Sequence, residues 1–123
     1  MTPQEQRDHI LVLEDEVIIA IDLAVSLEEA GYAVMGPYHC AATALAELES
    51  GTLPRWAILD VNLGRDQTSE DVARRLTDKN VPILFLTGYE ERSSRVLQQF
   101  PAAAKMPKPM VFQTICNWLS HHS

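Results

Sequence analysis

The chain has 123 residues, 46% of them hydrophobic and 22% charged, which is typical of one folded domain and too short for two. A net charge of −7 argues against a nucleic-acid-binding surface. No apolar run is long enough to cross a bilayer, and the first residues carry no secretory signal. We therefore expect a cytoplasmic protein that binds neither nucleic acid nor membrane. We also expect residues 1–8 to be a flexible lead-in to a single domain over 1–123, with no output domain.

Short apolar runs alternate with segments of helical period along the chain. In chain order, the predicted strands are 9–13, 32–36, 56–60, 81–87 and 102–106, and the predicted helices are 16–30, 41–48, 69–77, 91–100 and 111–119. This fivefold alternation with short connections predicts a parallel sheet with helices on both faces, a doubly wound α/β domain.

The first and last predicted helices repeat apolar residues at helical spacing. In the first helix these residues are Val17, Ile18, Ile21, Ala24 or Val25, and Leu27, and in the last they are Val111, Ile115, Trp118 and Leu119. Gly31 is a suitable residue for the C-terminal end of the first helix.

Polar side chains stand where the predicted strands end. Glu14 and Asp15 follow the first strand, and Asp60 closes the third. Thr87 closes the fourth, and Lys108 follows the fifth. Because the carboxyl ends of parallel strands meet at one edge of a sheet, we expect these side chains to share a cleft. Taken singly, each fits a helix cap, a turn or a solvated surface, but the full set in this order is hard to produce by chance.

The chemistry of this set points to phosphoryl transfer. Three neighbouring carboxylates repel one another and need a cation, and hard oxygen ligands suit Mg²⁺. Asp60 can then act as a nucleophile that becomes an acyl phosphate. Lys108 supplies a point charge and Thr87 a hydroxyl donor for the phosphoryl oxygens.

With these motifs the chain resembles the receiver domain of response regulators in two-component signalling, over about residues 9–119. The matching pieces are "LVLEDE" with Glu14 and Asp15, "AILDVNLG" with Asp60, "LFLTGY" with Thr87, and "PKP" with Lys108. The resemblance implies a flavodoxin-like (βα)5 fold whose parallel strands lie in the order 2-1-3-4-5.

The resemblance also implies a site and a reaction. Mg²⁺ would be bound by Asp15, Asp60 and the backbone carbonyl of Asn62, with Glu14 acting mostly through water. A histidine kinase or a histidine phosphotransfer protein would phosphorylate Asp60. The domain would be no enzyme beyond its self-phosphorylation and autodephosphorylation, and its signal would pass to an unknown downstream protein.

One departure from the family concerns the residue three positions before the active-site lysine. Receivers usually carry an aromatic residue there that follows the threonine inward, whereas this chain has Lys105. The "LTGY" segment is similar to the receiver subgroup with a FATGY-like motif, and Tyr89 is our candidate for the missing coupling. Lys108 is preferred over Lys105 as the active-site lysine because Pro109 follows it directly.

The family's usual partner surface combines the fourth helix, the fifth strand and the fifth helix. In this chain it carries Arg92, Arg95 and Lys105, which favours an acidic partner. The chain is expected to be a monomer, or a weak dimer through this surface. His121 and His122, native or remnants of a tag, are given no function.

Alternatives remain within and outside the family. The domain can serve as a phosphate sink, as a phosphorelay shuttle, or as a scaffold that works without phosphorylation. A phosphohydrolase of the haloacid-dehalogenase type is a weaker alternative, because Asn62 stands where that family needs a second acid.

Overall fold

The computed structural model describes residues 9–65, 67–88 and 95–122, which form five strands and five helices. The strands are β1 (His9–Leu13), β2 (Ala33–Tyr38), β3 (Trp56–Asp60), β4 (Ile83–Thr87) and β5 (Ala104–Pro107). The helices are α2 (Val17–Glu29), α3 (Ala41–Glu49), α4 (Glu70–Asp78), α5 (Arg95–Gln99) and α6 (Phe112–His121). All strand pairs are parallel, in the order β2-β1-β3-β4-β5. The predicted fold class and strand order are therefore confirmed.

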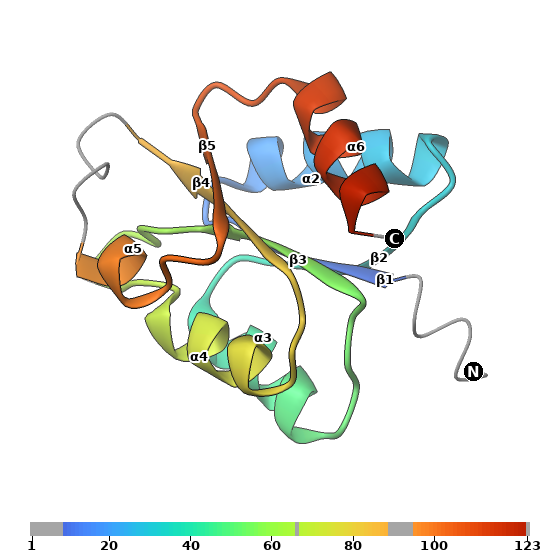
Figure 1. Cartoon of the computed structure of the whole chain (residues 1–123). Coiled ribbons are helices and arrows are strands. Elements are labelled where there is room, and N and C mark those ends of the chain that lie inside the picture. The colour runs from blue at the N-terminus through green and yellow to red at the C-terminus, as the bar shows by residue number, and fades with distance from the viewer. Residues whose placement is uncertain (1–8, 66, 89–94, 123) are drawn as a thin grey trace.

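The sheet separates two layers of helices. Figure 1 shows α2 and α6 on one face and α3, α4 and α5 on the other. Alternate residues of β1 serve the two faces: Leu11 and Leu13 belong to one core cluster, and Ile10 and Val12 to the other. Every residue of β3 and β4 is buried, as expected for central strands covered on both sides.

β2 is longer than predicted. It continues through Gly36 and Pro37 to Tyr38, because its register with β1 shifts between Leu11 and Leu13. A bulge there absorbs Gly36, whose φ of 103° suits glycine, and a Cβ at this position would lie 2.7 Å from the Tyr38 backbone nitrogen. The end predicted at Gly36 was wrong because glycine here marks a bulge and not a turn.

The apolar spacing predicted for α2 marks its buried face only in part, because Ala24 and Leu27 are buried whereas the other members are not. The residues that face the core are Ala20, Leu23, Ala24 and Leu27. Ile18 is 83% exposed, and Val17, Ile21 and Val25 are each about half exposed. Because α2 is apolar on most sides, one set of apolar residues can pack against the sheet while another faces outward. Val111, just before α6, is likewise exposed, although it was expected to share a face with Ile115 and Leu119.

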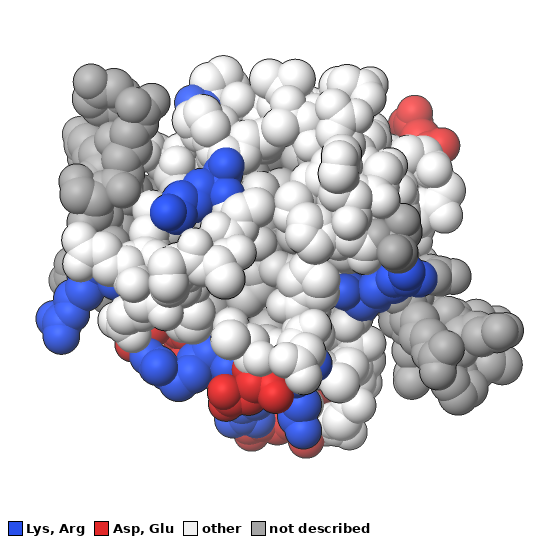
Figure 2. Space-filling model, viewed as in Figure 1, with Lys and Arg blue, Asp and Glu red and all other residues white. Residues whose placement is uncertain are grey.

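Charged side chains are unevenly distributed over the surface. In the view of Figure 2, side chains of both signs gather over α3 and α4, whereas the region over α6 is largely uncharged. Consistent with this, the sequence has no Asp, Glu, Lys or Arg after Lys108. Within the described ranges, no helix has the length and apolar character needed to cross a membrane.

Candidate functional site

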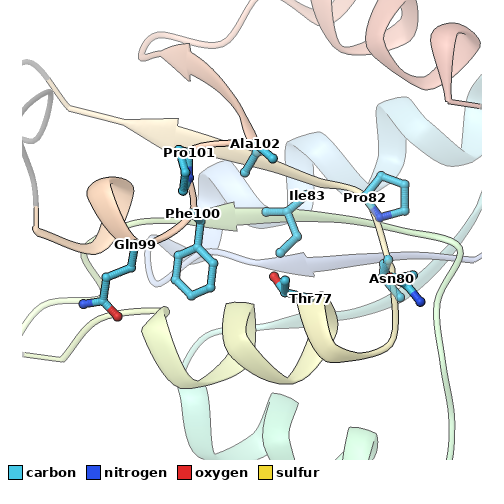
Figure 3. A pocket seen from close by; sticks show the side chains of 10 residues that line it. Thr77, Asn80, Pro82, Ile83, Gln99, Phe100, Pro101 and Ala102 are labelled. Carbon is cyan, nitrogen blue, oxygen red and sulfur yellow. The ribbon is translucent and has the colours of Figure 1, made fainter.

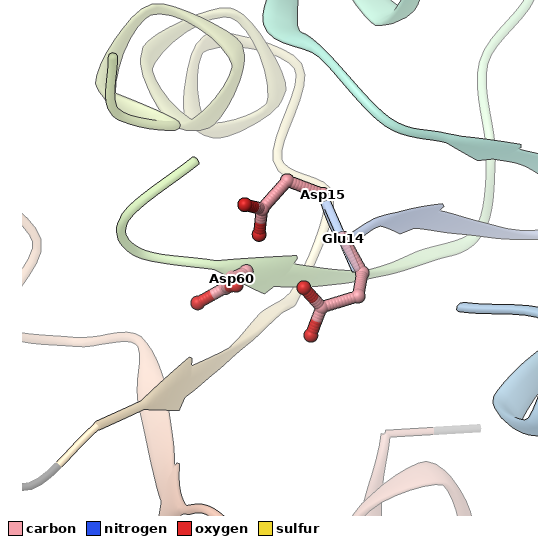
Figure 4. A group of neighbouring side chains, drawn as sticks. All are labelled: Glu14, Asp15 and Asp60. Carbon is pink, nitrogen blue, oxygen red and sulfur yellow. The ribbon is translucent and has the colours of Figure 1, made fainter. Parts of the chain in front are cut away.

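Three carboxylates meet at the carboxyl edge of the sheet. Strands β1 and β3 are paired, with Leu13 opposite Leu59. Glu14 and Asp15, which follow Leu13, therefore lie beside Asp60, which follows Leu59. One ligand oxygen of each acid lies within 4.8 Å of the others. Figure 4 shows the three side chains converging from the ends of the two strands. The expected cluster of acids is therefore present.

Lys108 reaches this cluster from the loop after β5. Its Nζ lies 2.9 Å from Asp60 Oδ2 and 3.0 Å from Glu14 Oε1. Its backbone N–H donates to the carbonyl oxygen of Thr87 at 2.9 Å, which fixes the start of the loop against the end of β4. Lys105 is exposed on β5 instead. Of the two lysines, Lys108 is thus the one that contacts Asp60.

Burial and shared charge set the protonation of the site. Burial, followed by a hydrogen bond with Glu14, raises the pKa of Asp60 to about 8, against an opposing effect of Lys108. Burial works to lower the pKa of Lys108, but its hydrogen bonds to Asp60 and Glu14 outweigh burial and raise it. Two carboxylates share one ammonium, so without a further cation the site retains a proton near neutral pH.

The Glu14 side chain has no exposed surface. Its Oε2 accepts from the backbone N–H of Glu16 at 3.1 Å, and its own N–H donates to Tyr38 at 2.9 Å. His39 Nδ1 lies 3.0 Å from the Glu14 carbonyl oxygen. The extension of β2 to Tyr38 therefore helps to position this acid. Its action through water stays a prediction.

The donor set suits a hard divalent cation. Carboxylate oxygens are preferred ligands of Mg²⁺, and a buried acid pair with a single ammonium leaves negative charge to be balanced. The loop after β3 comes close, since a Cβ at Gly64 would lie 3.3 Å from Asp15 Oδ2. Asn62 lies in this loop, and its side-chain Oδ1 accepts from the Gly64 N–H at 3.0 Å. The role of its backbone carbonyl as a ligand stays a prediction.

The remaining predicted residues lie around the end of β4. Thr87 is 4% exposed, at the same edge of the sheet as Asp60. Arg95 is exposed at the start of α5, on the proposed partner surface with Lys105. Tyr89 and Arg92 lie outside the described residues, so the coupling assigned to Tyr89 stays a prediction.

Two other features of the molecule, a cavity and the exposed apolar residues of α2, differ in their position relative to the site. A cavity of about 330 Å³, lined by residues that include Ile83 and Phe100 (Figure 3), lies toward the start of β4, away from the acids. The exposed apolar residues of α2, by contrast, begin at Val17, two positions after the acidic pair. This exposed apolar surface could have been predicted from the sequence, because apolar residues occur on more than one side of the helix.

Comparisons with known proteins agree with this geometry. SdrG from Sphingomonas melonis Fr1 superimposes with a TM-score of 0.78 and 31% identity, over 99% of this chain and 98% of that one. A response regulator receiver protein from Sinorhizobium medicae gives a TM-score of 0.78 at 25% identity, over 94% of both chains. The chain belongs to the response-regulator receiver family. No protein-family profile matches this receiver domain.

Two curated relatives are longer proteins. The receiver domain is 31% identical over 84 residues to the phyllosphere-induced regulator PhyR of Methylorubrum extorquens, covering 68% of this chain and 32% of PhyR. It is 36% identical over 86 residues to the transcriptional regulatory protein PdtaR of Mycobacterium tuberculosis, covering 68% of this chain and 40% of PdtaR. The chain thus spans about a third to two fifths of these relatives.

Proposed function

We propose that this receiver domain works as a switch that accepts a phosphoryl group on Asp60 in a Mg²⁺-dependent reaction. The observation that carries the proposal is the contact of Lys108 with Asp60 within a cluster of three carboxylates. A lone buried aspartate needs neither a second acid nor a lysine, whereas a phosphoryl acceptor needs both a cation site and a positive charge for the incoming oxygens.

The reaction follows from the positions of these groups. A carboxylate oxygen of Asp60 forms a bond to phosphorus as the phosphorus–nitrogen bond of a phosphohistidine breaks. The electron pair of that bond stays on the departing imidazole nitrogen. Lys108 and the Thr87 hydroxyl donate to phosphoryl oxygens. A divalent cation held by Asp15 and Asp60 balances charge on the transferred group when it is bound.

Ionisation of Asp60 is the step that the site must favour. Its raised pKa holds a proton on the metal-free site, and a protonated carboxyl is a poor nucleophile. A divalent cation held by Asp15 and Asp60 would add positive charge beside the Asp60 carboxyl and would lower its pKa.

The phosphodonor is a histidine kinase or a histidine phosphotransfer protein that covers the same edge of the sheet. Val17, Ile18 and Ile21 extend an exposed apolar surface from the acidic pair along α2. Exposed apolar surface beside polar residues is typical of protein interfaces. A donor that rests on this surface can bring its phosphohistidine to Asp60.

The test is incubation with phosphoramidate and Mg²⁺, followed by intact-mass measurement. The proposal expects one phosphoryl adduct in the wild type, its loss when Mg²⁺ is chelated, and its absence in Asp60→Ala. Lys79→Gln, a change on the loop after α4, is the matched control and keeps the adduct.

The other outcomes separate the alternatives. Absence of an adduct in the wild type contradicts the proposal and favours a phosphorylation-independent scaffold. Steady turnover of unrelated phosphomonoesters favours a phosphohydrolase. In a parallel incubation with a phosphorylated histidine kinase, rapid return of the phosphoryl group to the kinase, without any partner bound, favours a phosphate sink or a relay shuttle.

A further inference from the structure

The cavity of about 330 Å³ lies between α4, the start of β4 and the segment that joins α5 to β5. Its floor is buried, since Val81, Ile83 and Phe100 are each at most 9% exposed. Thr77 from the last turn of α4 and Ala102 before β5 also line it, and both are exposed. Because all strands are parallel, the start of β4 is at the edge of the sheet opposite to the acid cluster, and the cavity is separate from that site.

The floor of the cavity is part of the packed core. Figure 3 shows the side chains of Phe100 and Ile83 pointing toward α4, where Thr77 lies. Phe100 packs on Phe85, with ring centroids 5.9 Å apart, and both belong to the core cluster that α4 covers. A floor of tightly packed core residues is already formed before a ligand arrives, which is typical of small-molecule sites.

The charges around the cavity favour a neutral ligand. Among the described residues that line it, none is charged, although 22% of the chain is. Arg74 lies 5.8 Å from the centroid of the Phe100 ring, but Glu70 and Gln99 accept from its Nη2 at 2.9 and 2.8 Å. Gln99 Nε2 also donates to Glu70 Oε1 at 3.0 Å, which closes the network. A buried charge on a ligand would find no counter-charge on the cavity wall, so an uncharged molecule binds at the lower cost.

The size of the cavity favours a bicyclic ring system. An apolar cavity of about 150 Å³ is enough to hold benzene, and this cavity has about twice that volume. It is also near the lower limit of about 300 Å³ for ligand pockets, which is too small for a dinucleotide or a flavin. Phe100 in the floor can pack edge-to-face or offset against an aromatic ligand, which adds to the gain from burial.

Thr77 offers a hydrogen bond to such a ligand. Within the described part of the chain, no hydrogen bond occupies its hydroxyl, whereas the amide of Gln99 is engaged by Arg74 and Glu70. A threonine in a helix can turn its O–H toward the carbonyl four residues earlier, which leaves its oxygen as an acceptor. A ring N–H is the donor that matches this oxygen.

We propose that the cavity between α4 and the start of β4 binds a small, uncharged, bicyclic aromatic molecule that carries one ring N–H, of the indole class. The ring system lies on Ile83 and against Phe100, and its N–H donates to the Thr77 hydroxyl oxygen. This ligand site does not depend on phosphorylation of Asp60, so the proposed function can fail while the ligand site stands, and the reverse.

The first test is an NMR titration of the whole chain with indole. We expect saturable shifts of the amide signals of Ile83, Phe100 and Ala102. Phenol, which has one ring fewer, should bind at least about tenfold more weakly because it buries less apolar surface. Absence of saturable shifts with indole, or shifts confined to Ile18 and Ile21 on the exposed apolar surface of α2, would overturn the proposal.

A second probe separates a free ligand from a side chain of a partner protein. N-acetyltryptophanamide carries the same ring with the flanking groups of a peptide. We expect it to bind at least about threefold more weakly than indole, because the ring system alone fills the cavity. Binding tighter than that of indole would overturn the assignment to a free small molecule and favour a tryptophan of a partner.

A variant at Thr77 tests the hydrogen bond, with benzofuran as the matched probe that has the same shape and no N–H. Thr77→Val keeps the branched shape of this exposed side chain and removes its hydroxyl. It should weaken indole binding about fivefold, the size of one net hydrogen bond, and leave benzofuran binding unchanged. Equal losses for both probes would contradict the role given to the Thr77 hydroxyl.

A variant at Ala102 tests the place of binding without a change in the core. Ala102→Phe adds a ring at the exposed rim and should abolish saturable indole binding, because that ring occupies the cavity. Ala42→Phe adds the same ring at an exposed position of α3 and should leave the affinity for indole unchanged. Equal affinities of the wild type and Ala102→Phe would refute this cavity as the indole site.

Discussion

The ammonium of Lys108 lies 2.9 Å from a carboxylate oxygen of Asp60, although the two residues are 48 positions apart in the chain. The same ammonium lies 3.0 Å from Glu14. One positive charge is thus divided between two buried acids. Under the proposed function, a cation would add positive charge at this site, and Lys108 would turn to the phosphoryl group after phosphorylation.

Replacing Lys108 tests this division of charge. Lys108→Gln should slow phosphorylation of Asp60 by phosphoramidate about a hundredfold, the typical effect of losing one donor to a developing charge. The measurement is the rate of adduct formation by intact mass. Lys79→Gln is the control for loss of a lysine. A rate within twofold of wild type for Lys108→Gln would refute the role given to this contact.

The stability of the metal-free protein should depend on pH through Asp60. Its pKa is about 8 in the folded state and near the ordinary 3.8 when unfolded. Between these values the folded state holds a proton that the unfolded state has lost, so stability falls as pH rises from about 4 to 8 and then levels off. Denaturant unfolding at several pH values, with a chelator present, measures this trend.

Asp60→Asn is the matching variant, since an amide has nearly the same shape and no charge. We expect it to be more stable than the wild type at pH 8 by about 1 kcal/mol or more. Its stability should also vary less with pH over the same window. A wild type and a variant with parallel pH profiles would show that Asp60 does not carry the dependence.

Divalent cations should stabilise the folded protein. A ligand that binds only the native state adds about 2.7 kcal/mol at a hundredfold excess over Kd. Mg²⁺ should therefore raise the midpoint of thermal unfolding, and Asp15→Asn should abolish most of that rise. Asp22→Asn removes an exposed acid of α2 and serves as the control. An equal Mg²⁺ effect in Asp15→Asn and the wild type would exclude Asp15 as a ligand.

The apolar surface of α2 should matter for protein donors and not for small ones. Ile18→Glu places a charge at the most exposed position and should slow transfer from a phosphorylated histidine kinase at least about tenfold. Its rate with phosphoramidate should match the wild type, because Ile18 is not part of the acid cluster. Leu53→Glu, a charge on an exposed apolar residue before β3, is the control. Equal kinase-dependent rates in all three proteins would place the donor elsewhere.

The sequence alone determined the fold and most members of the site. Strands such as β3 and β4 are continuous apolar runs, and this local pattern does not depend on what covers them. Once five parallel strands are recognised, the residues at their carboxyl ends must meet at one edge. Glu14, Asp15 and Asp60 could therefore be grouped before any coordinates were known.

Only the tertiary structure decided which face of α2 is free and how Lys108, the lysine favoured from the sequence, reaches both Asp60 and Glu14. Lys108 and Lys105 are close in sequence, and strand register together with the start of α6 determines which ammonium points to the acids. The burial of Ala20 and exposure of Ile18 likewise follow from how closely α2 approaches the sheet. Packing between segments that are distant in sequence determines these contacts and exposures. The apolar pattern of a helix does not predict its buried face when apolar residues occur on several sides.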